Sequence, residues 1–455
     1  MQFGSGQCVK TPNGYSSNPG GRSTTAASTT YRQLLGNPNY LRVFVAGLGS
    51  SAGSAISGVC LVWIVYFSTS SALDVGLLGT SYLAAATVFS IFGGTLVDRY
   101  DRRRLMILSD VARAIAMALV VLALVLRGFD LLTIFGAYAV VAAFTTVFNP
   151  AEQSIVPALV SPGLIADANG LIRSTRSALT FVGASVGGVL IVTLGPVLGV
   201  ALNAVTFGIS AALLLGMTIS SAPRVSGSSA GRTPSYFADL AEGFAWLRRA
   251  RGFLQLTISA TFFNFCMGVV ETFLVVFATT VLKGSALVYA LLLAVYVAGN
   301  GVGSLLVSRL QAVRWAGRAW TIPYGVMSGS VALALALFPS TTFALVALFV
   351  LGTLGGFAGT AWLSAAQLLV PGEMQGRYFG IDSFGSIAII PAAQIGGAFL
   401  IAAYGVRDTY LLAAAVWVVA GAVFLLPRAL WNLGYRPSKA AVADPRDGRT
   451  ETTTR

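Results

Sequence analysis

Twelve apolar stretches constrain this chain more than any other feature of its sequence. Each has roughly the 20-residue length that crosses a bilayer core as an α-helix. Hydrophobic residues make up 56% of the 455 positions and charged residues only 10%, against about 25% charged in soluble domains. Backbone groups in lipid must be bonded within their own segment, so the pattern predicts an all-α integral membrane protein with 12 transmembrane helices. The predicted spans are 43–66, 75–96, 105–126, 131–148, 178–198, 200–219, 254–280, 287–307, 319–338, 343–369, 383–404 and 409–426.

The connections between these spans alternate between basic and nearly uncharged. If the N-terminus is cytoplasmic, all but four of the 29 Lys and Arg residues fall on the cytoplasmic side, the exceptions being Arg113, Arg127, Lys283 and Arg407. Positive charge marks the cytoplasmic loops of membrane proteins. We therefore expect a multi-pass protein of the cell (plasma) membrane with both termini cytoplasmic. The net charge of +13 is then explained by membrane topology, with the lipid bilayer as the partner. It does not indicate a nucleic-acid partner.

Charge and small-residue content divide the chain into five parts. Residues 1–42 contain no acidic residue and no signal-peptide core, which predicts a disordered cytoplasmic N-terminus. Residues 43–219 and 253–427 are predicted six-helix bundles. Between them, 220–252 is a cytoplasmic linker with an amphipathic helix, because Phe237, Leu240, Phe244 and Leu247 recur at helical spacing among charges. Residues 428–455 form a cytoplasmic tail.

The two bundles read as copies of one unit. The segment 93–99 after the second span is echoed by 303–309 after the eighth, and 151–157 after the fourth by 365–371 after the tenth. Two six-helix pseudo-repeats are the architecture of carriers that rock around a central site.

Enzyme chemistry is largely excluded by residue content. Histidine is absent and there are three cysteines, so we expect no catalytic residue, no metal site and no cofactor. The segment 4–11 only approximates a phosphate-binding loop, and 183–187 spells a nucleophile elbow inside an apolar span, where close helix packing is the better interpretation. Without a nucleotide site, transport would draw on an ion gradient.

One loop carries a family resemblance. The segment 94–104, Gly-Thr-Leu-Val-Asp-Arg-Tyr-Asp-Arg-Arg-Arg, resembles the loop 2–3 signature of the major facilitator superfamily, with Asp101 at a usual glycine. Together with 148–151, 156–160 and 168–170 the pattern is similar to the drug and siderophore exporter branch, over residues 40–426. The resemblance implies the major facilitator fold and a conformational latch, in which Asp98 reaches the start of the eleventh span and Arg102 helps to hold it. The latch residues it implies are Gly94, Asp98, Arg99, Arg102 and Arg103.

Two positions depart from the exporter pattern. In the fifth span Gly183, Gly187 and Gly188 are present for helix packing, but Ala184 stands at the usual proline. No arginine occurs within 131–148, where many proton antiporters of the family carry one.

Ionisable residues at membrane depth usually mark a pathway or a structural pair, because an unpaired charge there costs several kcal/mol. Glu271 near the middle of the seventh span, with Asn264 on a comparable face, is our candidate for proton or substrate binding; a hydrogen-bonded structural carboxyl is the alternative. Asp110 and Arg113 are spaced for an ion pair within one helix, and a clasp onto the loop 2–3 is favoured over a coupling role. For Asp382, capping of a helix N-terminus is favoured over coupling.

These features predict a secondary active transporter, monomeric, that exports amphipathic or cationic small molecules in exchange for protons by alternating access. Its cavity is expected to be mostly apolar, and the family resemblance implies that the first, fourth, seventh and tenth spans line it. The alternatives are a small-metabolite uptake carrier, a passive conduit and a non-transporting membrane receptor. Candidate liners are Trp63, Tyr66, Tyr138, Phe262, Phe263 and Phe265.

Overall fold

A computed structural model describes residues 32–126, 128–161, 164–217, 236–371 and 389–434, with 374, 378–379, 381–382 and 385–386. Within the helices, the side chains at 91–95, 98–99, 166, 170, 173, 177, 236–241 and 308 lie outside that description. The N-terminal extension predicted for 1–42 falls outside it up to residue 31, as does the tail after residue 434.

In this part of the chain, eleven helices are long and apolar enough to cross a membrane. The first six are α2 (Pro38–Thr69), α3 (Ala72–Arg99), α4 (Arg102–Leu126), α5 (Leu131–Leu159), α6 (Ile165–Thr193) and α7 (Pro196–Leu215). The short helix α8 (Tyr236–Arg249) follows. The seventh span consists of α9 (Arg251–Thr272), α10 (Leu274–Val276) and η2 (Phe277–Val281), and the eighth is α11 (Ala286–Arg309). The ninth is built from η3 (Ala312–Trp315), α12 (Ala316–Ala319), η4 (Trp320–Met327) and α13 (Ser328–Leu337), and the chain continues with α14 (Thr341–Leu369), α16 (Ile390–Val423) and the short α17 (Arg428–Trp431).

The eleventh of these helices contains two spans. Gly405 inside α16 has φ 83° and ψ 162°, which is not helical, and glycine adopts such a conformation without the steric penalty of a Cβ. The chain turns there, so 390–404 and 406–423 cross separately and the fold has the twelve predicted spans.

Polar side chains and proline start several of the helices. Asn37, Ser71 and Asp130 accept hydrogen bonds from the first backbone amides of α2, α3 and α5, as favoured N-caps do. Pro196 begins α7 directly after Gly195, whose φ is 86°. Short turns of this kind join consecutive spans as antiparallel neighbours.

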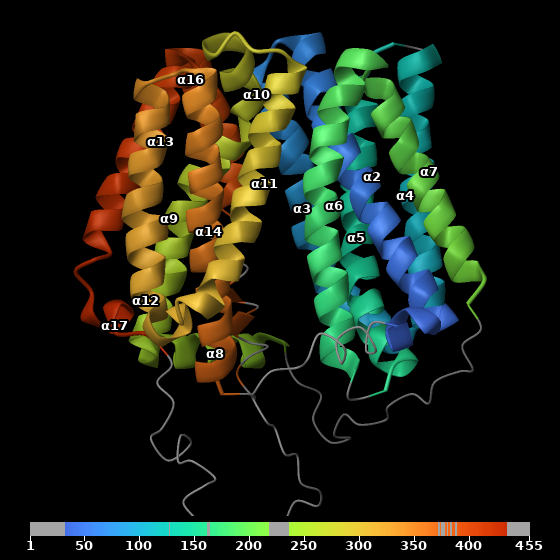
Figure 1. Cartoon of the computed structure of the whole chain (residues 1–455), viewed down its shortest axis with the longest axis horizontal. Helices are drawn as coiled ribbons and strands as arrows, with labels where there is room; N and C mark the ends of the chain where they lie inside the picture. The colour runs from blue at the N-terminus through green and yellow to red at the C-terminus, as the bar shows by residue number, and fades with distance from the viewer. Residues whose placement is uncertain are drawn as a thin grey trace, which may run out of the picture.

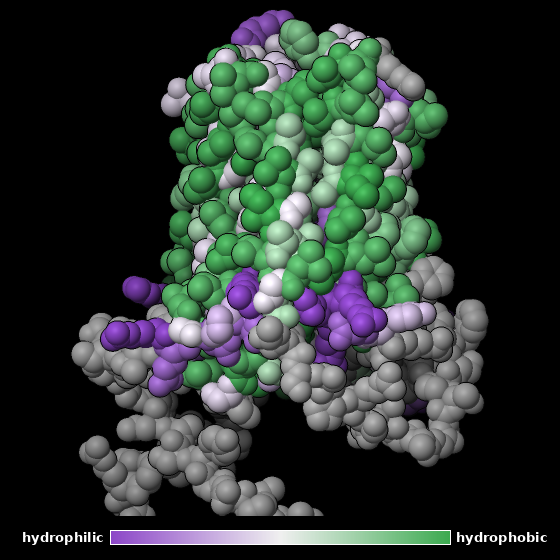
Figure 2. All heavy atoms as spheres, turned by 90° about the vertical axis from the view of Figure 1, so that its right-hand side faces the viewer, coloured by the Kyte–Doolittle hydropathy of each residue, from purple (hydrophilic) through white to green (hydrophobic). Residues whose placement is uncertain are grey.

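The spans form two bundles that stand side by side (Figure 1). Helices α2 to α7 make the N-terminal bundle and α9 to α16 the C-terminal bundle. They contact each other mainly through α6 with α11 and through α3 with α16. We call the end of the bundles at which α8 lies the linker end, and the opposite end the far end. The face of the N-terminal bundle in Figure 2 is a broad apolar band with hydrophilic residues gathered toward the linker end.

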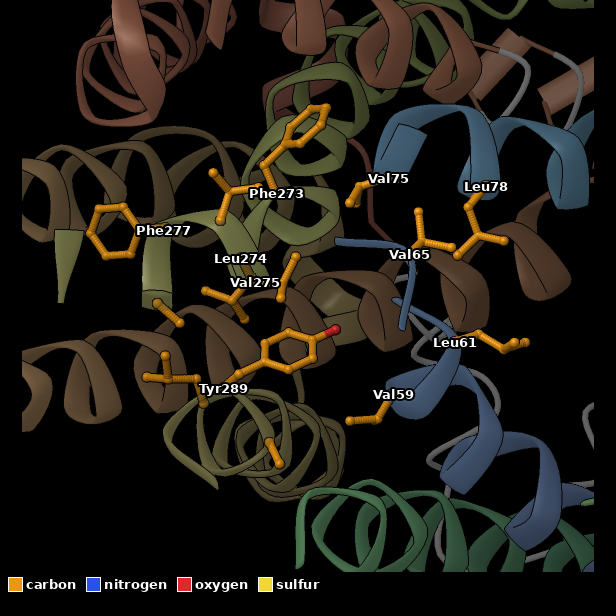
Figure 3. Packing of buried hydrophobic residues seen from close by; sticks show 14 of the residues in the cluster. Val59, Leu61, Val65, Val75, Leu78, Phe273, Leu274, Val275, Phe277 and Tyr289 are labelled. Carbon is orange, nitrogen blue, oxygen red and sulfur yellow. The ribbon is translucent and has the colours of Figure 1, made fainter. Parts of the chain in front are cut away.

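The buried core joins the two bundles only in its far-end part, as far as the described residues show. One cluster includes Leu61 and Val65 of α2, Leu78 of α3, and Phe273 and Tyr289 of the C-terminal bundle, and Figure 3 shows the two sets of side chains approaching each other. Toward the linker end, separate clusters around Met106 and around Tyr378 each stay within one bundle and its adjoining segments. The far end is therefore sealed by apolar packing.

Candidate functional site

Each bundle contains a cavity of its own. The N-terminal cavity, about 320 Å³, is lined by side chains from α2 to α7. Twelve of the sixteen lining residues carry a polar group, although apolar atoms still make up the larger part of the lining surface. The lining residues are Ser50, Ser51, Ser54, Ser57, Tyr82, Arg113, Tyr138, Thr145, Asn149, Arg176, Thr180 and Asn203, with Gly47, Ala55, Val141 and Phe148.

Asp110 and Arg113 form the ion pair that their spacing on one helix allows. Arg113 Nη2 lies 2.5 Å from Asp110 Oδ1, and the two residues are 3% and 0% exposed. The second carboxylate oxygen of Asp110 accepts a hydrogen bond of 2.5 Å from Ser210 on α7. Asp110 thus ties α4 to α7 within the bundle. The clasp onto the loop 2–3 stays a prediction, because the side chains at 98–99 lie outside the described residues.

The Arg113 guanidinium is held by more than its carboxylate. It lies 4.4 Å from the ring centroid of Phe148 and 4.5 Å from that of Phe207, distances at which cation–π attraction is effective. Its Nη1 donates to Thr145 Oγ1 at 3.4 Å. The side chain thereby reaches the cavity wall while its charge stays compensated.

A second ion pair was missed from the sequence. Glu152 on α5 accepts hydrogen bonds of 2.9 and 2.7 Å from Arg176 Nη2 on α6. The prediction ended the fourth span at 148 and placed Arg176 in a loop, whereas α5 runs to Leu159 and Arg176 lies inside α6. Gly47 lies against this pair, since a Cβ at that position would collide with Glu152 Oε1. The sequence repeat between 151–157 and 365–371 was the available signal that the segment containing Glu152 is structurally important. It did not indicate which residue pairs with Glu152.

The C-terminal cavity, about 250 Å³, combines aromatic and polar side chains. Asn264 belongs to it: its Nδ2 donates to the Ser386 carbonyl at 3.0 Å and its Oδ1 accepts from the Tyr324 hydroxyl at 3.3 Å. The lining residues are Ala260, Asn264, Tyr296, Asn300, Trp320, Tyr324, Gly355, Gly359, Trp362, Asp382 and Ser386.

Asp382 lies in the wall of this cavity with 3% exposure. Its Oδ1 accepts a 2.5 Å hydrogen bond from Thr257 on α9, and Tyr378 also bonds its carboxylate. The Asp382 carboxylate is thus bonded to side chains across the bundle and borders the cavity. Its capping of a helix N-terminus stays a prediction.

Glu271 lies one residue before the end of α9 and is exposed, although Val270 and Phe273 beside it are buried in the far-end cluster. Its carboxylate is within electrostatic range of Tyr296 and Tyr324, both of which line the C-terminal cavity. Seven residues separate it from Asn264, which places the two on one face of the helix. The structure thus brings Glu271 and Asn264 to the same side of the bundle, with Glu271 nearer the far end.

The predicted aromatic liners divide. Tyr138 lines the N-terminal cavity, whereas Phe263 is fully buried and packs edge-on against Tyr324. Phe262 is 49% exposed and does not line the cavity. The aromatic residues that do line a cavity, and that the sequence did not single out as liners, are Tyr82, Phe148, Tyr296, Trp320, Tyr324 and Trp362.

The arginines of the loop 2–3 bond to helix ends within the N-terminal bundle. Arg102 donates to the Ser154 carbonyl at 2.9 Å. Arg103 donates to the carbonyls of Leu214 and Leu215 at 2.8 and 2.5 Å, which complements the negative end of α7. The side chains of Asp98 and Arg99, and Gly94, fall outside the described residues, so the latch stays a prediction.

Glycines of α6 make close approaches on two sides. A Cβ at Gly183 or Gly187 would lie 2.9 or 3.0 Å from a backbone carbonyl oxygen of α2. At Gly188 it would collide with Ala290 of α11, across the bundle interface. Small residues let helices approach closely in membranes, and here they serve both packing within the bundle and contact between bundles.

Two bundles of membrane-spanning helices, each with a cavity lined in part by polar side chains, define a multi-pass membrane transporter. The sequence profile of the Major Facilitator Superfamily matches residues 43–393. The chain belongs to this superfamily and is a transporter of small molecules.

Relatives agree over most of the chain. It is 25% identical over 411 residues to the multidrug efflux pump Tap of Mycobacterium tuberculosis, covering 88% of this chain and 96% of that one. It is 21% identical over 392 residues to the uncharacterized MFS-type transporter YvqJ of Bacillus subtilis, with 86% and 92% coverage.

Solved structures share the fold. A bacterial homolog of the human lysosomal transporter Spinster superposes with a TM-score of 0.67 at 16% identity, covering 88% of this chain and 99% of that one. The nucleoside transporter NupG gives a TM-score of 0.68 at 13% identity, with 87% and 99% coverage. At these identities the likeness concerns the fold alone.

Proposed function

We propose that this chain is a proton-coupled exporter of amphipathic or cationic small molecules, acting as a monomer by alternating access. The observation that carries the proposal is Glu271, an exposed carboxylate on α9 on the same helix face as Asn264, which lines the C-terminal cavity. A carboxylate attracts a cation, and the faces of the aromatic side chains that line the C-terminal cavity attract positive charge as well. Similarity to a multidrug efflux pump over nearly the full length of both chains supports export as the direction of transport.

The arrangement of the cores supports one state of the cycle. The far end is sealed by a cluster shared between bundles, while the clusters toward the linker end stay within one bundle each. Because basic residues gather at the linker end, the positive-inside rule supports this end as the cytoplasmic side of the plasma membrane, and with it both termini as cytoplasmic. The state is then open inward, ready to receive substrate from the cytoplasm.

Glu271 stands in the chain between Val270 and Phe273, two members of the far-end cluster. A proton arriving from the far side would reach this carboxylate first once the seal opens, and substrate bound from the linker side would compete with it. Competition for one carboxylate is sufficient to couple export of a cation to proton entry, because the two cannot neutralise it together.

The test is efflux of fluorescent cationic and amphipathic dyes from vesicles reconstituted with the purified protein, with and without an imposed pH gradient. We expect gradient-driven efflux by the wild type and its loss in Glu271→Gln. Asp408→Asn is the matched control, since Asp408 is an exposed carboxylate of α16 away from both cavities.

Other outcomes separate the alternatives. Dye movement that ignores the pH gradient would contradict coupling and indicate a passive conduit. Gradient-driven efflux retained in Glu271→Gln would move the coupling site to Asp110 or Asp382. If no dye moves but a metabolite is accumulated, the chain is an uptake carrier and the specificity argument is wrong.

A further inference from the structure

The N-terminal cavity contains polar groups that nothing in the described protein satisfies. Ser50 is 4% exposed, its Oγ has no hydrogen-bond partner, and it lines the cavity. Arg176 Nε, a buried donor of another cavity-lining side chain, also lacks a partner. A buried donor left without an acceptor costs about 1–3 kcal/mol, so a wall with two of them is suited to an acceptor that arrives from the cavity.

The charges of this bundle are arranged so that donors face the cavity. Arg113 and Arg176 line it, whereas their partners Asp110 and Glu152 do not. Glu152 receives both of its bonds from one nitrogen, Nη2 of Arg176, which leaves the rest of that guanidinium to the cavity. The four charges sum to zero. The hydroxyls of Ser51, Ser57, Thr145 and Thr180 already donate to backbone carbonyls, so among the described lining residues the buried donors left for a ligand are Ser50 Oγ and Arg176 Nε.

The C-terminal cavity has the opposite character. Asp382 lines it among Tyr296, Trp320, Tyr324 and Trp362, and no Lys or Arg is among the described residues of its lining. A substrate suited to both bundles would therefore carry positive charge or aromatic surface at one part and acceptor oxygens at another.

We infer that the N-terminal cavity is a substrate subsite for acceptor oxygens, a carboxylate foremost, bound by Ser50 Oγ and the free edge of the Arg176 guanidinium. The planar guanidinium is suited to a carboxylate because it presents donors in a fixed fork. The inference rests on the proposed export of cationic amphipaths and narrows it: zwitterionic amphipaths, with a carboxylate in addition to the cation, are the preferred class.

A matched pair of dyes tests this subsite. A rhodamine methyl ester is a cation without a carboxylate, and the corresponding rhodamine free acid has the same chromophore with the carboxylate exposed. Transport of each is measured in reconstituted vesicles as a function of dye concentration, for wild type, Ser50→Ala and Arg176→Lys. Ser185→Ala is the control, since its hydroxyl is on α6, bonds the Phe181 carbonyl and lies outside the cavity.

We expect the wild type to transport both dyes. Ser50→Ala should raise the KM of the free acid about tenfold, the effect of a lost hydrogen bond to a charged group, and change that of the ester by less than about twofold. Arg176→Lys should also raise the KM of the free acid more than that of the ester. This variant weakens the partner of Glu152 and can therefore fail to fold. In that case Ser50→Ala alone tests the subsite.

The outcomes distinguish failure of the proposed export function from failure of the carboxylate subsite. If the wild type transports neither dye, the proposed function fails. If it transports the ester but not the free acid, or if Ser50→Ala affects both dyes equally or neither, the proposed function stands and the carboxylate subsite is overturned.

Discussion

Removing the Asp110 carboxylate should be among the most damaging single changes in the N-terminal bundle. The Asp110→Ala variant would leave the Arg113 guanidinium, 3% exposed, without its counter-charge and would strip Ser210 of its acceptor. The polar contacts that remain to Arg113 are long, 3.3 Å to the Ser109 carbonyl and 3.4 Å to Thr145. Breaking a buried pair by removing one partner costs about 3–5 kcal/mol, and we expect a loss of that size.

The two phenyl contacts of Arg113 remain in Asp110→Ala, so they cannot offset the loss. Removing the charge as well, in Asp110→Ala with Arg113→Met, should restore stability to within about 2 kcal/mol of the wild type, the difference being the lost cation–π attraction. A double-mutant cycle then gives the coupling energy of the pair.

The assay is unfolding of the purified protein by SDS in mixed micelles, followed by the fluorescence of its seven tryptophans. The single variant should unfold at a lower SDS fraction than the double variant. The reasoning is refuted if the double variant is no more stable than Asp110→Ala, because the damage would then come from lost packing and not from an uncompensated charge.

Three further predictions follow from the helix contacts. Gly188→Leu, which would force α6 away from Ala290, should part the far end and be seen as a longer distance between spin labels on α6 and α11; an unchanged distance would show that the interface can absorb the side chain. Gly303→Val should abolish folding of the C-terminal bundle, since its Cβ would meet the Thr353 backbone of α14, and a normal yield of monodisperse protein would contradict this. Asp98→Asn should weaken transport without reducing membrane insertion, and full transport by a well-expressed variant would reject the latch.

The spans and their number could be predicted from the sequence because bilayer thickness sets the length of an apolar run. The apolar runs did not predict that a helix continues through polar residues beyond the end of a run. α5 extends past Pro150 because Ala151, Ile155 and Val156 are buried against neighbouring helices, a stabilisation that no local pattern encodes.

The candidate site was only partly predictable for a related reason. Asp110 and Arg113 are neighbours on one helix, so spacing indicated their pairing. Glu152 and Arg176 lie on different helices, and Asp382 meets Thr257 across 125 positions of sequence; such contacts depend on how helices pack. The serine-lined cavity was missed because Ser50, Ser54 and Ser57 occur in a run that reads as small, helix-packing residues.

The apolar seal at the far end carries a thermal consequence. Side chains such as Leu61, Leu78 and Phe273 are buried there between the bundles, and parting them would expose hydrocarbon to water, with the positive heat-capacity change that such exposure brings. Hydrophobic association weakens on cooling. Cold should therefore loosen the far-end seal independently of any ion gradient, so that membranes kept near freezing would hold more of this protein with its far end open than membranes at growth temperature.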